Sequence, residues 1–340
     1  MNKILEPTIA SLSQVAKELA RGGIAVLPTE TVYGLAASIE HPSAIEAIFR
    51  AKGRPNDNPL IVHIHSIEQL GKLAVDIPTA VKQLAHAFWP GPLSIVLKKS
   101  DQVSAAITAG GDTVAIRMPD HPVPLAVMAQ ENLCLAMPSA NLFMGISPTS
   151  AGMVGAEIVS ASYAVIDGGP CSVGIESTVL DLSGEVPTIL RLGVISAEEI
   201  SAVLGESVKV AATIERVTEE VGMEVAGSEA GGTEAGGTEV LRSPGQYKRH
   251  YAPRTKAILV NKISQNGYGL SCLRSVESPL STGRQIFVGD TPKEYAKNLY
   301  AALAELDALG IEVIEIEKPP TSEGWQAVWD RLTKATTPYR

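Results

Sequence analysis

The feature that most constrains the fold is a glycine-rich repeat in the second half of the chain. From Gly227 to Glu239 the sequence carries two tandem Ala-Gly-Gly-Thr-Glu copies after a degenerate first copy. Glycine and like charges leave nothing to bury, so this stretch is typical of a mobile linker. Two folded units are therefore expected, which fits 340 residues at about 100–200 residues per domain. We place the first domain at residues 1–205, the linker with its insert at 206–254 and the second domain at 255–340.

Charge is distributed unevenly between these parts. Residues 1–204 carry 12 basic and 19 acidic side chains, residues 205–242 carry 3 and 8, and residues 243–340 carry 13 and 10. The net charges are therefore −7, −5 and +3. An acidic first domain argues against a broad nucleic-acid surface, and it leaves room for a small cationic pocket.

The sequence also argues against several other classes of protein. No apolar run approaches the roughly 18 residues that span a bilayer, and Pro7 breaks the opening segment too early for a signal peptide. Cys134, Cys171 and Cys272 are scattered singly, so we expect neither a zinc cluster nor a disulfide framework. We therefore expect a cytoplasmic protein without a membrane segment and without metal-ligating residues.

Short β-branched runs alternate with helical patterns in the first domain, as in α/β proteins built around one twisted sheet. The predicted strands are Ile24–Leu27, Leu60–Ile64, Leu93–Leu97, Thr113–Arg117, Leu133–Met137, Ala164–Ile166, Thr178–Leu182 and Thr188–Arg191, and the predicted helices include Leu12–Leu19 and Ile45–Lys52. Ser43 with Glu46, and Ser196 with Glu199, have the spacing of a capping box at a helix start.

The second domain repeats this alternation on a smaller scale. Strands are predicted at Ala257–Val260, Ile286–Val288 and Val313–Ile316, and helices at Pro292–Leu309 and Gly324–Lys334. The pattern favours a small doubly wound, Rossmann-like unit.

The usual nucleotide-binding and hydrolase motifs are absent from the sequence. It has neither a Gly-x-x-x-x-Gly-Lys-Ser/Thr phosphate loop nor a Gly-x-Gly-x-x-Gly turn after a strand. A Gly-x-Ser-x-Gly elbow and a His-Glu-x-x-His pair are also missing. Common hydrolase, kinase and dehydrogenase activities therefore lose most of their support.

The densest polar cluster runs from Arg50 to Pro59, where a predicted helix passes into a loop. It holds three cations within five residues, and Pro55 and Pro59 stiffen the loop that follows Lys52 and Arg54. Cations at a helix C-terminus can simply favour the helix dipole. Alternatively, two cations held at a fixed separation form a binding site for a polyanion such as phosphate.

Further polar groups lie at predicted strand ends, where an open α/β sheet forms its ligand crevice. They include Thr31, Ser139, Ser177 and Arg191. Hydroxyls at such places also commonly satisfy only the backbone of a turn.

His63 lies inside the run Ile61-Val62-His63-Ile64-His65, and Arg117 lies at the end of another apolar strand. A buried, hydrogen-bonded structural role for His63 is as reasonable as ligand binding. Arg117 closes the apolar run Thr113–Arg117. A buried cation needs an anionic partner, and a substrate carboxylate would serve.

Four motifs together resemble the YrdC/Sua5 family of threonylcarbamoyl-AMP synthases. They are Thr29-Glu30-Thr31-Val32-Tyr33-Gly34-Leu35, Lys52-Gly53-Arg54-Pro55, Ser139-Ala140-Asn141 and the segment from Ser243 to Pro253. The resemblance spans nearly the whole chain except the 206–242 insert. It implies a YrdC-like twisted α/β sheet with a large cationic cavity, followed by a smaller Rossmann-like Sua5 domain.

The resemblance also implies an activity and partners. The implied reaction converts ATP, L-threonine and bicarbonate or CO2 into L-threonylcarbamoyladenylate, pyrophosphate and water, with Mg2+ accompanying ATP. The product would pass to the tRNA threonylcarbamoyl transferase machinery for t6A modification of tRNA.

By the same resemblance, catalysis falls to Lys52 and Arg54. The implied contacts to L-threonine are Thr31, His63, Arg117, Met137 and Ser177. The implied contacts to ATP are Lys52, Arg54, Asn58, Thr113, Ser139, Asn141, Ser147, Arg191 and Tyr247. Segment 243–253, with its Tyr247, is expected to act as a lid.

Two other functions have to be weighed against this one. An RNA-binding module would need a continuous cationic surface, against which the net charge of −7 on residues 1–204 counts. A carbamoyl-transfer domain like those of hydrogenase-maturation proteins usually accompanies zinc-finger and acylphosphatase segments, and neither is recognisable here.

Overall fold

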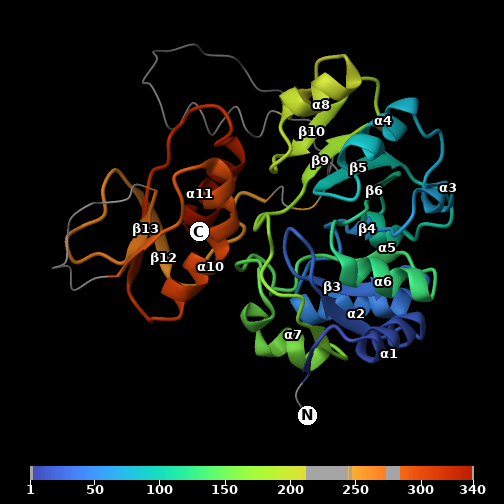
Figure 1. Cartoon of the computed structure of the whole chain (residues 1–340), viewed down its shortest axis with the longest axis horizontal. Helices are drawn as coiled ribbons and strands as arrows, with labels where there is room; N and C mark the ends of the chain where they lie inside the picture. Colours follow the sequence, from blue (N-terminus) through green and yellow to red (C-terminus); the bar gives the residue numbers. More distant parts are fainter. Residues whose placement is uncertain (1–2, 212–243, 245–246, 273–283, 339–340) are drawn as a thin grey trace.

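The computed structural model describes residues 3–211, 244, 247–272 and 284–338. It contains a large α/β body, drawn from blue to yellow in Figure 1, and a smaller one, drawn in orange and red. Most of the insert expected at 206–242, including the glycine-rich repeat, lies outside the described residues. No helix in the described ranges has the length and apolarity needed to cross a membrane.

The large body is built on a mixed sheet of 11 strands in the order β1-β8-β2-β3-β7-β4-β6-β5-β9-β10-β11. The strands are β1 Ile4–Leu5, β2 Ile24–Leu27, β3 Gly34–Ser38, β4 Ile61–His63, β5 Leu93–Lys98, β6 Thr113–Arg117, β7 Leu135–Ala136, β8 Val165–Ile166, β9 Thr178–Asp181, β10 Thr188–Arg191 and β11 Lys209–Val210. The parallel pair β4–β6 sets His63 opposite Arg117. The register therefore brings two candidate site residues side by side.

Eight α-helices surround this sheet in the described part of the chain. They are α1 Ile9–Ala20, α2 Pro42–Lys52, α3 Leu70–Leu73, α4 Thr79–Phe88, α5 Ala105–Thr108, α6 Pro122–Gln130, α7 Ala156–Ala161 and α8 Ala197–Leu204. α1 and α6 bury their apolar side chains, such as Leu19 and Val127, in a cluster with Leu27 of the sheet. Burial of such side chains is worth roughly 1.5–3 kcal/mol each.

The predicted strands of the first domain all fall on observed strands, and β2, β6 and β10 match at both ends. β3 escapes prediction because its sequence, Gly-Leu-Ala-Ala-Ser, has little β-branched character. The Ser196–Glu199 capping box is confirmed. The Ser43–Glu46 box is wrong, because Pro42 takes the first helical position and moves the N-cap to His41.

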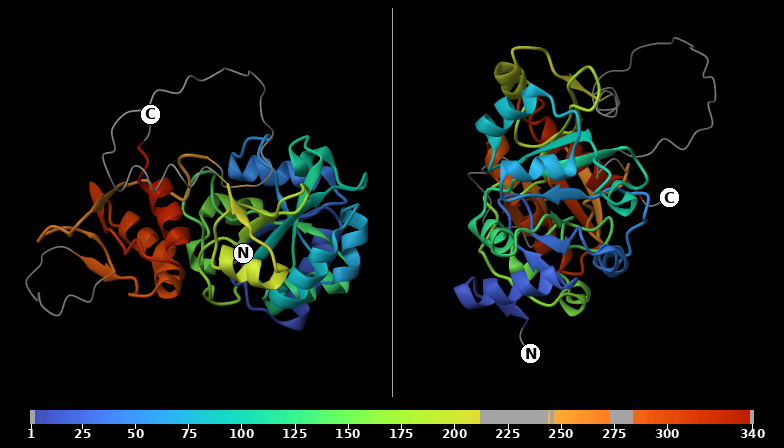
Figure 2. Two further views of the ribbon diagram at one scale, coloured as in Figure 1. Left: turned by 90° about the horizontal axis from the view of Figure 1, so that it is seen from above. Right: turned by 90° about the vertical axis from the view of Figure 1, so that its right-hand side faces the viewer.

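The smaller body has a parallel sheet in the order β12-β15-β13-β14. Its elements are β12 Lys256–Val260, β13 Gly269–Ser271, β14 Gln285–Phe287, α10 Pro292–Asp307, β15 Val313–Glu317 and α11 Gln326–Thr336. The prediction of a smaller α/β unit is confirmed, although β13 was not predicted and the two described helices lie on one face of the sheet, not on both faces as in a doubly wound unit. Figures 1 and 2 show that α10 and α11 lie between this sheet and the large body.

The large sheet also extends further along the chain than the boundary expected at residue 205. β11 pairs parallel with β10 through Lys209 and Val210. Beyond the insert, Ala252 forms a bridge with Gly145 of the large body. The chain therefore touches the large body again before it enters the smaller one.

Candidate active site

A buried cavity lies where the large sheet and its loops meet Pro244, His250 and Tyr251. Its volume is about 50 Å3. Its polar lining residues are Thr31, Arg54, His63, Arg117, Ser139, Glu176, Ser177, Arg191, His250 and Tyr251. Pro244, His250 and Tyr251 fill one side of the cavity and keep it small. Seven of these residues were expected from the sequence: Thr31, Arg54, His63, Arg117, Ser139, Ser177 and Arg191.

Arg117 is held by three groups at one end of the cavity. Its Nη2 lies 2.6 Å from Oε1 of Glu30, and both side chains are about 95% buried. Its Nη1 donates to the hydroxyl of Thr31 at 2.9 Å, and its Nε donates to the carbonyl of Gly91 at 3.1 Å. The anionic partner that the sequence analysis sought in a substrate is therefore supplied here by Glu30.

Thr31 owes its position to the turn that follows β2. The hydroxyl of Thr29 lies 2.9 Å from that of Thr31 and accepts the backbone N–H groups of Thr31 and Val32. Thr29 is therefore the turn-forming residue, which leaves the hydroxyl of Thr31 to meet Arg117.

His63 and Met137 lie beside this group. His63 is buried, and its Nδ1 has no hydrogen-bond partner among the described residues. Burial, reinforced by Arg117, lowers the pKa of His63 to about 3. Met137 packs against Gly34, where an added Cβ would lie 2.3 Å from its Cγ. Gly34 is therefore required for this close packing.

Ser177 and Arg191 form a second group in the cavity wall. Arg191 donates through Nε to the carbonyl of Ser177 at 3.1 Å and through Nη2 to its hydroxyl at 3.0 Å. The hydroxyl of Ser177 also lies 2.8 Å from that of Ser94. Burial lowers the pKa of Arg191. The guanidinium is thus fixed by the chain segment that carries Ser177.

The Lys-x-Arg and Ser-x-Asn motifs meet at the end of α2. Nζ of Lys52 donates to the backbone carbonyls of Ser139 and Asn141, at 2.5 and 2.6 Å. Arg54 donates to the carbonyls of Asn58 and Pro59. Lys52 and Arg54 are both buried, and burial lowers the pKa of Lys52 well below its usual range and that of Arg54 to about 10.

The remaining expected residues surround the cavity without lining it. Asn58 is fully buried, and its side-chain amide has no hydrogen-bond partner among the described residues. Thr113 begins β6, two residues before Ala115, which pairs with Ile61. It therefore lies at the end of the sheet where the Arg54–Pro59 loop enters β4.

Ser147 and Tyr247 are engaged with protein groups. Ser147 donates its hydroxyl to Oε1 of Glu176 at 2.7 Å. Tyr247 donates to Oδ1 of Asp57 at 3.2 Å, and its ring meets Phe143 edge-on. Tyr247 thus lies over the loop that carries Arg54.

Several site residues went unassigned in the sequence. Glu30 lies inside the Thr29–Leu35 motif, and Glu176 directly precedes the assigned Ser177. His250 and Tyr251 lie in the segment from Ser243 to Pro253 that resembles the family. These four surround or line the cavity. A buried carboxylate beside each arginine could have been inferred, since buried charges need partners.

In the described part of the chain, no three His, Cys, Asp or Glu side chains gather as metal ligands. The two carboxylates of the site are each bound to an arginine, Glu30 to Arg117 and Glu176 to Arg331. A metal ion would therefore have to compete with a buried guanidinium for either of them.

Two buried histidines make stability depend on pH. Burial lowers the pKa of His63 and of His250 to about 3, against about 6.5 in an unfolded chain. Between these values only the unfolded chain binds the protons, so acid favours unfolding. We expect the free energy of unfolding, measured with urea, to fall by about 2 kcal/mol from pH 7 to 5.5.

A substitution separates this effect from the titration of other groups. His63→Gln should remove about half of the fall, while His86→Gln, at an exposed position of α4, should leave it unchanged. Glu176 acts outside this window: burial opposes its ionisation, yet Arg331 and Arg191 lower its pKa to about 2. A pH-independent free energy of unfolding from pH 7 to 5.5 would contradict the assignment.

Fold and cavity together define a two-domain α/β protein with a buried cavity lined by arginines. Two family models match the chain: one described as telomere recombination (Sua5/YciO/YrdC) over residues 17–193, and one described as the threonylcarbamoyl-AMP synthase C-terminal domain over residues 195–337. The chain belongs to the Sua5/YciO/YrdC family, in the two-domain form that carries the Sua5 C-terminal domain.

Individual relatives agree with this assignment over nearly the full length. The threonylcarbamoyl-AMP synthase of Pyrococcus abyssi is 37% identical, covering 94% of this chain and 92% of its own. That of Bacillus subtilis is 35% identical, covering 95% and 92%. The crystal structure of P. abyssi Sua5 complexed with L-threonine superimposes with a TM-score of 0.83 at 35% identity, covering 99% of this chain and 97% of that one.

Proposed function

We propose that this protein is an L-threonylcarbamoyladenylate synthase. The observation that carries the proposal is the set of buried cations Lys52, Arg54 and Arg191, none of which has an ion-pair partner within the described ranges. Uncompensated buried cations are costly unless an anion is bound. A triphosphate would supply such an anion, and the relatives named above are threonylcarbamoyl-AMP synthases.

The chemistry requires positioning rather than a protein nucleophile. The amine of L-threonine adds to CO2 and loses a proton, which gives a carbamate. A carbamate oxygen then attacks the α-phosphorus of ATP, and the bond to the β-phosphate oxygen breaks as pyrophosphate leaves with its electron pair. In-line placement of two bound reactants can supply several kcal/mol of the barrier.

The Thr31–Arg117 end of the cavity suits the amino acid. A guanidinium has five N–H donors, and Glu30, Thr31 and Gly91 engage three groups of Arg117. Donors remain for the carboxylate of L-threonine. Thr31, His63, Met137 and Ser177 would contact the rest of that substrate.

The Lys52–Arg54 end suits ATP. Arg54 and Arg191 would neutralise charge on the departing pyrophosphate, as preorganised cations do in phosphoryl transfer. Asn58 and Asn141 each have a buried side-chain oxygen without a hydrogen-bond partner among the described residues, which indicates unmet polar contacts near this end. Thr113, Ser139, Ser147 and Tyr247 complete the proposed ATP region, and Mg2+ would enter bound to the phosphates as part of the substrate.

Pro244 and residues 247–251 would open for substrates and close over them. A cavity of about 50 Å3 is far smaller than the roughly 300–1,000 Å3 of ligand sites in general. Pro244, His250 and Tyr251 line its closed side, so outward movement of this segment would enlarge it. Closure would then shield the labile carbamate from water.

The product of this reaction would serve tRNA modification. The proposed acceptor is the tRNA threonylcarbamoyl transferase machinery, and the proposed location is the cytoplasm, where ATP, L-threonine and tRNA are available together. The net charge of −7 on residues 1–204 favours a small-molecule site over direct RNA binding.

The test is pyrophosphate release from ATP with L-threonine or bicarbonate omitted in turn. Release should require both, and L-serine should replace L-threonine poorly. Release that ignores L-threonine would exclude this activity, and salt-sensitive RNA binding in its place would support an RNA-binding module.

A further inference from the structure

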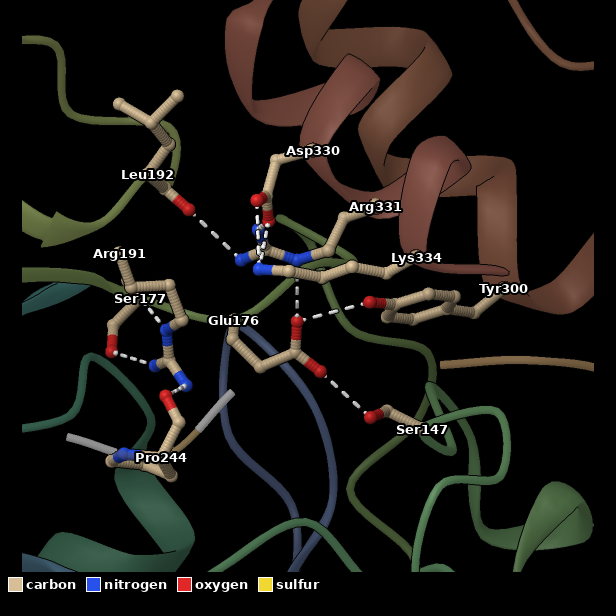
Figure 3. Close-up of polar contacts among 10 residues, drawn as sticks. All are labelled: Ser147, Glu176, Ser177, Arg191, Leu192, Pro244, Tyr300, Asp330, Arg331 and Lys334. Carbon is tan, nitrogen blue, oxygen red and sulfur yellow. Dashed lines mark hydrogen bonds and ion pairs between the residues drawn. The ribbon is translucent and has the colours of Figure 1, made fainter. Parts of the chain in front are cut away.

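Arg331 of α11 is fully buried, and although it belongs to the smaller body, two of its partners belong to the larger one. Its Nε donates to Oε2 of Glu176 at 2.9 Å, and its Nη2 donates to the carbonyl of Leu192, also at 2.9 Å. Figure 3 shows the guanidinium between these two groups. One side chain of the second domain therefore binds two separate segments of the first.

These two segments carry the Ser177–Arg191 group of the cavity. Glu176 directly precedes Ser177, and Leu192 directly follows Arg191. Because Arg191 donates twice to Ser177, these four residues form a connected set, and Arg331 binds both of its segments (Figure 3). A shift of Arg331 would move both segments together.

Glu176 is the central acceptor of this network. Oε2 also accepts the hydroxyl of Tyr300 from α10 at 3.0 Å, while Oε1 accepts the hydroxyl of Ser147 at 2.7 Å. Arg331 and Arg191 keep the carboxylate ionised against the effect of burial, with its pKa lowered to about 2. Both helices of the second domain that face the first thus bind one carboxylate in the cavity wall.

The orientation of Arg331 is itself fixed. Asp330 accepts from its Nη1 at 2.5 Å and pairs with Lys334, whose Nζ lies 2.7 Å from Oδ1 of Asp330. The guanidinium carbon also lies 5.1 Å from the ring centre of Tyr251, which lines the cavity. The fork of Arg331 is therefore held in one geometry, as precise placement of its partners requires.

Docking of the two bodies alone does not account for this arrangement. Replacing a buried ion pair by apolar residues is often neutral or stabilising, so the network is weak evidence for a purely stabilising role. The network of Arg331 instead fixes the positions of Glu176 and Leu192, which are adjacent to Ser177 and Arg191.

We propose that Arg331 and Tyr300 are positioning residues through which the second domain sets the placement of Ser177 and Arg191 in the cavity. The inference deepens the proposed function and rests on it for the identity of the substrates. Arg191 is proposed to contact phosphate groups, so the affinity for pyrophosphate reports the placement of Arg191 without requiring turnover.

The test compares Tyr300→Phe with Tyr295→Phe. Both tyrosines are buried on α10, but the hydroxyl of Tyr295 has no hydrogen-bond partner among the described residues, so its loss is the matched control. Calorimetric titration with magnesium pyrophosphate should show about threefold weaker binding for Tyr300→Phe than for the wild type. Tyr295→Phe should bind magnesium pyrophosphate with wild-type affinity. Melting temperatures should agree within the scatter of replicate wild-type samples.

Arg331→Lys extends the test, because lysine keeps the charge and loses the fork. We expect about tenfold weaker pyrophosphate binding, and a kcat for threonine-dependent turnover that falls by at least the same factor. If Arg331→Lys does not fold, the pyrophosphate affinity of Tyr300→Phe alone tests the positioning role. Wild-type pyrophosphate affinity in the folded variants would overturn the positioning role. A wild-type protein that binds pyrophosphate but shows no threonine-dependent release would instead refute the proposed function.

Discussion

Lys52→Ala and Arg54→Ala are each expected to lower kcat/KM for ATP by about 1,000-fold, the upper range for loss of one charge-stabilising donor in an active site. Lys52 has two roles to lose. Its ammonium is the proposed phosphate contact, and it also holds the carbonyls of Ser139 and Asn141 in place. Arg54 lines the cavity directly. Pyrophosphate release at saturating L-threonine and bicarbonate measures both effects.

Arg50→Ala is the matched control, because Arg50 lies in the last turn of α2 with Lys52 and is exposed. It should keep the wild-type rate. Circular dichroism should show folded protein for all three variants. Near-normal turnover of both Lys52→Ala and Arg54→Ala would remove the phosphate-binding role from this cluster, whereas a loss in Arg50→Ala would point to the helix end as a whole.

The fold was largely predictable because its strands are apolar and bounded by turn residues. Thr113–Arg117 and Thr188–Arg191 match observed strands at both ends. β3 could not be found in this way, since Gly34–Ser38 combines small residues and becomes a strand by pairing with β2 and β7. Its stability comes from neighbours distant in sequence, which single-segment propensity does not contain.

The site was predictable where its residues fall in short motifs. The sequence shows that Lys52 and Arg54 are close together. It does not show that Lys52 contacts Ser139, which lies 87 positions further along the chain. That contact depends on the order of the strands. The structure also shows that Lys52 faces backbone carbonyls, so the arginines Arg54, Arg117 and Arg191 are the cations that line the cavity among the described residues.

Arg331 illustrates a residue that sequence reasoning could not find. In the sequence, Asp330 and Arg331 are two adjacent charged residues within the predicted helix Gly324–Lys334, with nothing that marks them as buried. Only the docking of α11 against the first domain turns Arg331 inward to Glu176. The opposite case is Glu30, which stood in a motif but had no visible partner until the sheet brought Arg117 to it.

The charges of the site follow one rule. Glu30 and Glu176 each neutralise one arginine, Arg117 and Arg331. The remaining cations of the site have no carboxylate within ion-pair distance in the described part of the chain, which leaves net positive charge for bound anions. The sequence-wide net charge of −9 gives no sign of this local balance.

Glu30→Gln is expected to destabilise the free protein by about 3 kcal/mol, because removing one partner of a buried ion pair leaves the other charge uncompensated. The same change should strengthen the response to L-threonine. In the wild type, Glu30 occupies Arg117 at 2.6 Å and repels a second carboxylate nearby. In the variant, the substrate carboxylate would provide the missing anion, so saturating L-threonine should raise the melting temperature more than it does in the wild type.

Two comparisons isolate this charge effect. Glu46→Gln removes an exposed carboxylate from α2 and should change neither stability nor the response to L-threonine. Glu30→Gln combined with Arg117→Met removes both charges together, so it should recover most of the lost stability and yet show no melting shift with L-threonine. A double variant that still responds to L-threonine would mean that the amino acid binds away from Arg117. An uncompensated buried charge on Arg117 must lower stability. A Glu30→Gln variant as stable as the wild type would therefore contradict a stabilising ion pair between Glu30 and Arg117.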